Sequence, residues 1–125
     1  MAHSHRPSFL NLMQIQMPVG ALTSIGHRIS GVLLAMCVPI GVYMLDLSLQ
    51  SEQTFLDVTS LFRYWPVKAA AIFTLWIFTH HVLAGVRHLL SDFNVGSTLH
   101  MARRSAWFVN LGGLAAALFA AGVWL

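Results

Sequence analysis

The stretch Ala69–Val86, AAAIFTLWIFTHHVLAGV, decides the fold class, because it contains no charged side chain from one end to the other. Two similar uncharged runs are Ile29–Leu45 and Ser105–Leu125. A helix needs about 20 apolar residues to cross roughly 30 Å of hydrocarbon, and each run is close to that length. None of the runs alternates polar with apolar residues, which excludes barrel strands. The sequence therefore predicts an all-α membrane protein with three transmembrane helices.

The composition supports a membrane location. The chain is 57% hydrophobic and 9% charged, whereas typical soluble proteins have about 25% charged residues. Its 125 residues allow one transmembrane domain, 1–125, with an N-terminal arm, 1–18, and helices at roughly 19–47, 66–90 and 103–125. The net charge of +3 is modest, so we expect contact with membrane lipid and no nucleic-acid partner.

The basic residues predict the orientation of the spans. Five arginines fall on one side and two basic residues on the other, and the positive-inside rule therefore places the N-terminus in the cytoplasm. Met1–Pro18 has neither a signal-peptide stretch nor the pattern of an organelle transit peptide. We expect the inner membrane of a bacterium and not that of a mitochondrion. The five arginines are Arg6, Arg28, Arg87, Arg103 and Arg104, and the other two residues are Arg63 and Lys68.

Four further features of the sequence predict local structure, two in the connecting segments and two within the spans. SLQSEQT, in the loop Asp46–Pro66, is typical of a turn or a short surface helix, and Asn94 and Gly96 are expected to break the following connection. Pro39 in the first span is compatible with a kink or with a packing role. The glycines and alanines of the third span indicate close packing against a neighbour.

Histidines in the second span are the first candidates for chemistry. His81 and His88 are seven residues apart and share a helix face with Gly85, while His80 points about 100° away. Histidine nitrogen binds iron, and glycine leaves room for a flat macrocycle against the helix. We expect His81, the deeper residue, as an axial ligand, and His88, beside Arg87, as a contact for an anionic group such as a haem propionate.

Two other interpretations of these histidines stay open. His81 can serve as a hydrogen-bonding residue between helices, without any cofactor. The adjacent pair of His80 and His81 can also indicate metal transport, but the two side chains face different directions and no carboxylate or cysteine joins them.

SIGHRISG, Ser24–Gly31, forms a second polar stripe. Ser24, His27, Arg28 and Gly31 fall on one continuous face of a helix that is about to enter lipid. The Ser24 hydroxyl can hydrogen-bond a quinone oxygen, and Arg28 can stabilise negative charge as the ring is reduced. The alternative is that Arg28 extends to lipid phosphates, as many arginines at membrane interfaces do.

In sequence order, these stretches resemble two signatures of the cytochrome b556 membrane-anchor subunits of succinate dehydrogenase. The first signature begins with Arg-Pro and closes on Ser-x-x-His-Arg-x-Ser/Thr. Ser8 departs from the aliphatic residue or threonine that is usual after the proline. The residues that match are Arg6, Pro7, Leu12, Val19, Ser24, His27, Arg28 and Ser30.

The second signature is His-x-x-x-Gly-x-Arg-His followed by Asp. Two residues of the following loop depart from the usual pattern: Ser91 stands where a bulky residue is usual, and Asn94 where a small one is usual. The residues that match are His81, Gly85, Arg87, His88 and Asp92.

The resemblance implies half of a helical bundle made by two small subunits, which share one haem b with one axial histidine from each. It implies that His81 is the iron ligand, that His27, Arg28 and His88 contact the haem, and that Ser24 and Arg28 contact ubiquinone. An iron–sulfur subunit would dock on this pair and receive electrons from a flavoprotein. The flavoprotein would carry out succinate oxidation, a step of the tricarboxylic acid cycle. We therefore expect no catalytic residue for that reaction in this chain.

Three alternatives remain at this stage. The chain can be a structural anchor that has lost haem, or the anchor of a fumarate reductase, because the sequence does not set the direction of the reaction. A small transporter is disfavoured, since the polar residues gather at one end of the helices and do not line a path across the membrane.

Overall fold

The computed structural model describes residues 17–125, which form four helices. Three of these, α1 (Val19–Gln50), α3 (Trp65–Asp92) and α4 (Leu99–Trp124), are long and apolar enough to cross a membrane. The fold class predicted from the sequence is confirmed for this part of the chain. Most of the expected N-terminal arm, including Arg6, Pro7, Ser8 and Leu12 of the first signature, lies outside the described residues.

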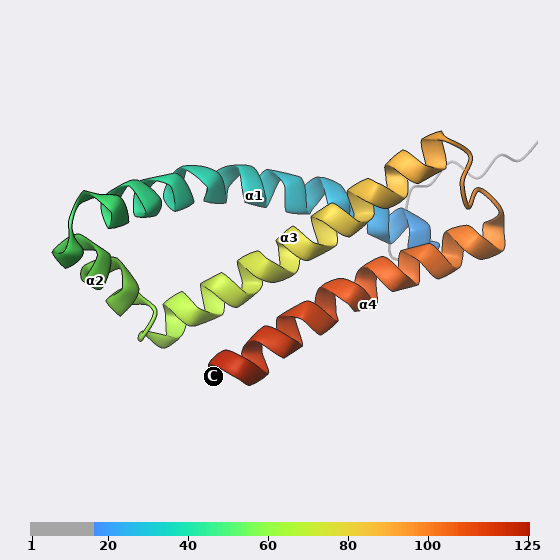
Figure 1. The fold of residues 1–125 in the computed structure, drawn as a ribbon. Coiled ribbons are helices and arrows are strands. Elements are labelled where there is room, and N and C mark those ends of the chain that lie inside the picture. Colours follow the sequence, from blue (N-terminus) through green and yellow to red (C-terminus); the bar gives the residue numbers. More distant parts are fainter. Residues whose placement is uncertain (1–16) are drawn as a thin grey trace, which may run out of the picture.

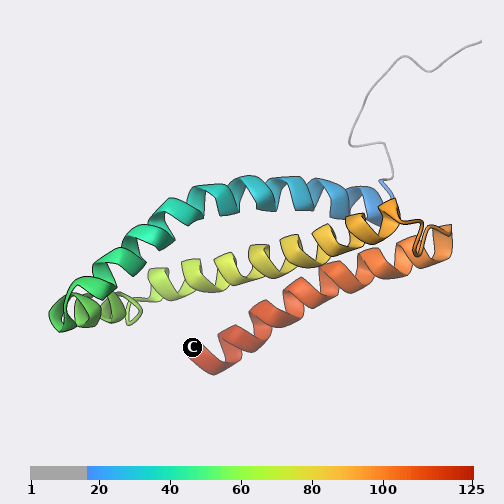
Figure 2. The same ribbon diagram turned by 45° about the horizontal axis from the view of Figure 1, so that its top comes forward.

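The long helices form an open bundle in which α3 lies between α1 and α4 (Figure 1). Helices α1 and α3 pack at the end that carries Arg28 and Arg87 and diverge toward the other end, where the short helix α2 (Glu52–Leu61) joins them. Figure 2 shows that α1 curves in its second half. This half contains Pro39, which removes one backbone hydrogen bond without ending the helix.

The stretch SLQSEQT, for which the sequence predicted a turn or a short surface helix, covers the end of α1 and the start of the short helix α2. The first residues of that stretch continue α1, and Ser51 starts a separate helix. The Ser51 hydroxyl accepts from the Thr54 N–H at 3.1 Å, and the Thr54 hydroxyl accepts from the Ser51 N–H at 3.0 Å. This capping box satisfies two backbone donors that the helix itself leaves unpaired.

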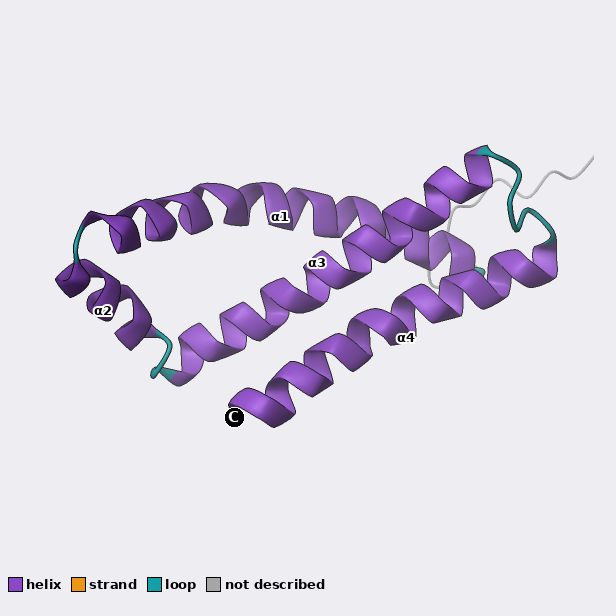
Figure 3. Ribbon diagram, in the orientation of Figure 1, coloured by secondary structure: helices purple, strands orange, loops and turns teal. Residues whose placement is uncertain are grey.

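The ends of the other helices also differ slightly from those expected. Helix α4 begins at Leu99 and not near Arg103, because the Thr98 hydroxyl caps the Met101 N–H. The preceding turn contains Asn94 with φ 59° and Gly96 with φ 72°, which confirms both residues as breakers. Helices account for nearly all of the described chain, as Figure 3 shows.

Small residues bring α3 and α4 together. Ala84 of α3 and Ala106 of α4 are completely buried. A Cβ atom added at Gly113 would lie 3.3 Å from the His80 Cβ, and one at Gly112 would lie 2.9 Å from the Leu83 Cδ1. The predicted close packing of the third span is therefore confirmed, and it is typical of helices that associate within lipid.

Candidate functional site

The imidazole of His81 is held by the backbone and a hydroxyl of α1. Its Nδ1 atom lies 3.1 Å from the His27 carbonyl oxygen and 3.1 Å from the Ser30 Oγ. The Ser30 hydroxyl itself donates to the His27 carbonyl at 2.9 Å. Ser30 is buried, so this arrangement is part of the contact between α1 and α3.

These contacts determine which nitrogen of His81 carries the proton. A carbonyl oxygen only accepts hydrogen bonds, so Nδ1 must be the donor. A neutral imidazole with its proton on Nδ1 has its lone pair on Nε2. In residues 17–125, no hydrogen bond uses the His81 Nε2. This is the state of a histidine that is ready to bind a metal through Nε2, with the second nitrogen fixed by a backbone carbonyl.

Three histidines gather around this position. The ring of His27 stacks on that of His81 with centroids 4.2 Å apart and an angle of 14° between the planes. The ring of His88 lies 5.2 Å from that of His27 and is tilted by 51°. The fold thus brings together three of the residues that the sequence singled out.

Glycines make room for the histidine rings. A Cβ atom added at Gly85 would lie 3.4 Å from the His27 Nε2, so the ring beside Gly85 in this chain is an imidazole. A Cβ at Gly31 would lie 3.0 Å from the His81 Cε1. A methyl group at Gly85 would make ordinary van der Waals contact with His27, whereas one at Gly31 would crowd the His81 ring. That Gly85 leaves room for a flat macrocycle stays a prediction.

His80 has separate surroundings, as its different helix face predicted. It is 9% exposed, and its Nε2 lies 3.2 Å from the Asn110 Oδ1 of α4. The Thr23 hydroxyl of α1 lies 3.3 Å from the same oxygen and 2.9 Å from the Val19 carbonyl. A Cβ at Gly26 would lie 2.9 Å from the His80 Cε1. His80 therefore connects three helices within the bundle.

Asn110 and Thr23 were not identified from the sequence as functional residues. Asn110 is the only amide side chain in the run Ser105–Leu125, and a polar group at such a depth usually has a partner within the protein. That signal was sufficient to expect an interhelical hydrogen bond, but not to name His80 as the partner. Ser30 was recognised only as a motif position, and its contact with His81 could not be derived from spacing.

Ser24 and Arg28 lie one helical turn apart on α1, close in sequence to His27 of the histidine cluster, which consists of His27, His81 and His88. Arg28 is exposed and Ser24 is half-buried. Because both side chains come from one edge of one helix, they form a polar strip and not an enclosed pocket. Any ligand bound there needs its other walls from outside this chain.

The side chain of Arg87 makes its hydrogen bonds with α4, unlike the ring of its neighbour His88, which lies near His27 of α1. Its Nε–H donates to the Ser105 Oγ at 3.1 Å, and its Nη2 donates to the Ala102 carbonyl at 3.4 Å. Both acceptors are on α4. A Cβ atom added at Gly20 of α1 would also lie 3.3 Å from the Arg87 Nη2, so the guanidinium lies where α3 and α4 meet the start of α1. The histidine cluster lies on the side of α3 that faces α1.

Comparison with known proteins gives the family. The sequence model of the succinate dehydrogenase/fumarate reductase transmembrane subunit matches residues 2–120. The chain belongs to this family. A succinate dehydrogenase cytochrome b556 subunit of Coxiella burnetii (strain RSA 493 / Nine Mile phase I) is 34% identical over 125 residues, which cover 98% of each chain. One from Paracoccus denitrificans is 27% identical over 114 residues, which cover 91% of this chain and 88% of that protein.

Membership confirms the resemblance that the two signatures indicated. The chain is a membrane subunit of the succinate dehydrogenase/fumarate reductase type, and its three long apolar helices agree with that role. The name cytochrome b556 of both relatives implies haem b in those proteins. The histidine cluster is where a haem-binding function of this chain can be argued from its own residues.

Proposed function

We propose that this chain is the cytochrome b556 anchor of a succinate:ubiquinone oxidoreductase, which provides one axial ligand to haem b and part of the quinone site. The observation that carries the proposal is the hydrogen bond from the His81 Nδ1 to the His27 carbonyl, which leaves Nε2 available for iron. The names of the relatives favour succinate oxidation over fumarate reduction.

The residues around His81 fit a haem group. His81 would bind the iron through Nε2, while His27 and His88 in the same cluster, together with exposed Arg28, would contact the anionic propionates. A bound haem would supply a one-electron carrier beside the quinone. The second axial histidine would come from another small anchor subunit.

Ser24 and Arg28 are the proposed contacts of this chain with ubiquinone. The Ser24 hydroxyl donates a hydrogen bond to a ring oxygen, and the Arg28 guanidinium stabilises the negative charge that develops there during reduction. Their position on one edge of α1 supports a site that is completed by the other anchor and by the iron–sulfur subunit. Electrons would reach the iron–sulfur subunit from a flavoprotein.

For the membrane, we propose the bacterial inner membrane with the N-terminus in the cytoplasm. The end of the bundle that carries Arg28, Arg87, Arg103 and Arg104 has more basic residues than the end with Arg63 and Lys68. The basic end would then be the cytoplasmic one, on which the iron–sulfur subunit docks.

The quinone role is tested with the purified complex by comparing Arg28→Ala with Arg104→Ala, a second exposed arginine at the same end. Arg28→Ala should lower the rate of quinone reduction by succinate about a hundred- to a thousandfold, the range found when a donor to a developing charge is removed. The rate at which succinate reduces an artificial acceptor should stay unchanged, because succinate would be oxidised in the flavoprotein, away from Arg28. Equal quinone rates in the two variants would contradict the proposal.

A further inference from the structure

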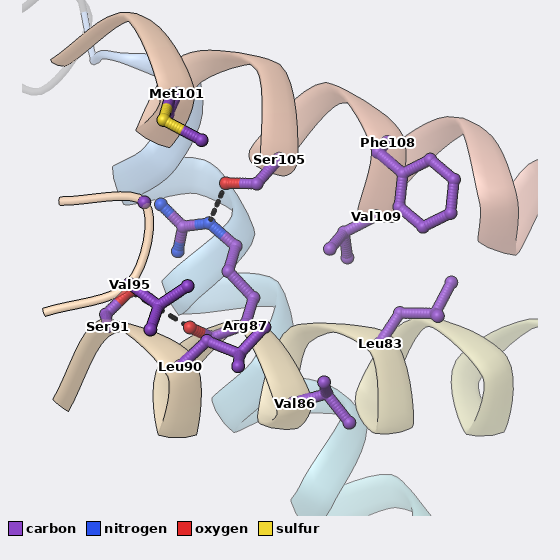
Figure 4. Close-up of a pocket in the computed structure, with 11 residues that line it drawn as sticks. Leu83, Val86, Arg87, Leu90, Ser91, Val95, Met101, Ser105, Phe108 and Val109 are labelled. Atoms are coloured by element: carbon purple, nitrogen blue, oxygen red, sulfur yellow. Dashed lines mark hydrogen bonds between the residues drawn. The ribbon is translucent and has the colours of Figure 1, made fainter. Parts of the chain in front are cut away.

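A groove between α3 and α4 lies beside Arg87, away from the histidine cluster. Its volume is about 260 Å³. Figure 4 shows Leu83 and Val86 of α3 opposite Phe108 and Val109 of α4, with the Arg87 guanidinium nearer the Met101 end. Most of the lining is apolar, and Arg87 provides its cationic group.

The charge of Arg87 is not neutralised by its hydrogen-bond partners. The Ser105 hydroxyl and the Ala102 carbonyl are both neutral acceptors. A guanidinium has five N–H donors, and these two hydrogen bonds fix its plane while leaving other donors for a ligand. Arg87 is half-buried, and a cation that is partly removed from water favours an anion nearby.

The shape of the groove is suited to the chain of a lipid. From Arg87 to Leu83, α3 rises roughly 6 Å, at 1.5 Å per residue, so the groove can hold the first part of a chain that continues into the roughly 15 Å of one leaflet's hydrocarbon. Val86 is 50% exposed, Leu90 is 46% exposed and Phe108 is 67% exposed, so the groove opens sideways from the bundle. An apolar chain can therefore enter from the bilayer without crossing the protein.

We propose that this groove binds one anionic phospholipid, with its phosphate on Arg87 and an acyl chain between Leu83 and Phe108. Charge complementarity selects an anionic headgroup, because arginine binds phosphate through paired N–H groups. Arg103 and Arg104 at the same end increase the local concentration of anionic lipid. The inference is independent of haem and quinone binding.

The test uses the whole purified complex and counts bound phosphatidylglycerol by native mass spectrometry during washing with a neutral detergent. Arg87→Gln removes the charge, and Arg103→Gln removes an exposed charge at the same end. Arg87→Gln should lower the retained phosphatidylglycerol about tenfold, as expected for the loss of a charge-assisted hydrogen bond. Arg103→Gln should retain it.

A second pair of variants tests the groove without changing any charge. Val86→Trp fills the groove, while Val82→Trp adds the same ring to a residue of α3 that is 44% exposed and does not line it. Only Val86→Trp should displace the lipid. Retention of phosphatidylglycerol in Arg87→Gln or in Val86→Trp, equal loss in both arginine variants, or release of a partner subunit from Arg87→Gln without lipid loss would overturn the proposal.

Discussion

The Nδ1 atom of His81 lies 3.1 Å from the carbonyl oxygen of His27, which belongs to a different membrane-spanning helix. This contact couples the packing of α1 against α3 to the chemistry of the imidazole, because the carbonyl determines which nitrogen is protonated. A change that moves α1 by a fraction of an ångström should therefore alter the haem binding that we propose for the Nε2 atom.

Ser30→Ala should weaken haem binding about tenfold, the lower end of the range for residues that orient a metal ligand. The substitution removes the hydroxyl that lies 3.1 Å from the His81 Nδ1 but keeps the His27 carbonyl. Haem retained per complex during dilution is the measurement. Thr74→Ala is the matched control, since its hydroxyl contacts only the Ala70 carbonyl of its own helix. Equal retention in both variants would show that Ser30 does not orient His81.

Gly31→Ala should lower haem content, whereas Gly41→Ala should not. A Cβ at position 31 would approach the His81 Cε1 to 3.0 Å, but one at position 41 would meet no atom within 4 Å. The ring of His81 must then rotate or α1 must move outward, at a cost of about 1–3 kcal/mol for an overpacked contact. The ratio of haem to protein in the two purified variants is compared. A normal haem content in Gly31→Ala would contradict the close contact between position 31 and the His81 ring.

Gly26→Ala should destabilise the bundle through His80 and not through the haem ligand. The added methyl group would lie 2.9 Å from the His80 Cε1, and His80 is buried between three helices. We expect a loss of about 1–3 kcal/mol in the free energy of unfolding, seen as a lower thermal midpoint of the complex. Gly122→Ala, with no atom within 4 Å of the added Cβ, is the control. A midpoint for Gly26→Ala that equals the control would exclude this close contact.

His80 and Asn110 should show a direct energetic coupling. A double-mutant cycle with His80→Phe and Asn110→Leu measures the hydrogen bond between the His80 Nε2 and the Asn110 Oδ1, which is 3.2 Å long. We expect about 0.6–1.7 kcal/mol, which extends from the average to the largest value found for hydrogen bonds between membrane helices in such cycles. Thermal unfolding of the four complexes provides the energies. Additive effects of the two substitutions would mean that the hydrogen bond makes no net contribution.

The sequence predicted the three spans well, because an uncharged run long enough to cross the hydrocarbon has few alternatives to a membrane helix. It predicted the ends of the helices less well. Thr98 starts α4 before the predicted position, and Ser51 separates α2 from α1, since both ends depend on side-chain caps that are local and short.

The candidate site was predicted only as helix faces. Periodicity separated His80 from His81 correctly, but it could not show that the His27 ring stacks on His81 or that Asn110 is the partner of His80. These contacts depend on how far α1, α3 and α4 slide along one another, and that register is set by glycines and alanines at the interfaces. Helical spacing within one span contains no information about it.

Whether His81 binds haem is tested most directly by the haem b content of the purified complex, measured by pyridine haemochrome and by the difference between reduced and oxidised spectra. The natural complex and His81→Ala are compared with His100→Ala, a control variant at an exposed histidine of α4. Assembly is checked by succinate oxidation with an artificial acceptor. We predict that His81→Ala loses haem b while still assembling, and that His100→Ala retains it. A full haem b signal in assembled His81→Ala, or none in the natural complex, would contradict haem binding by His81.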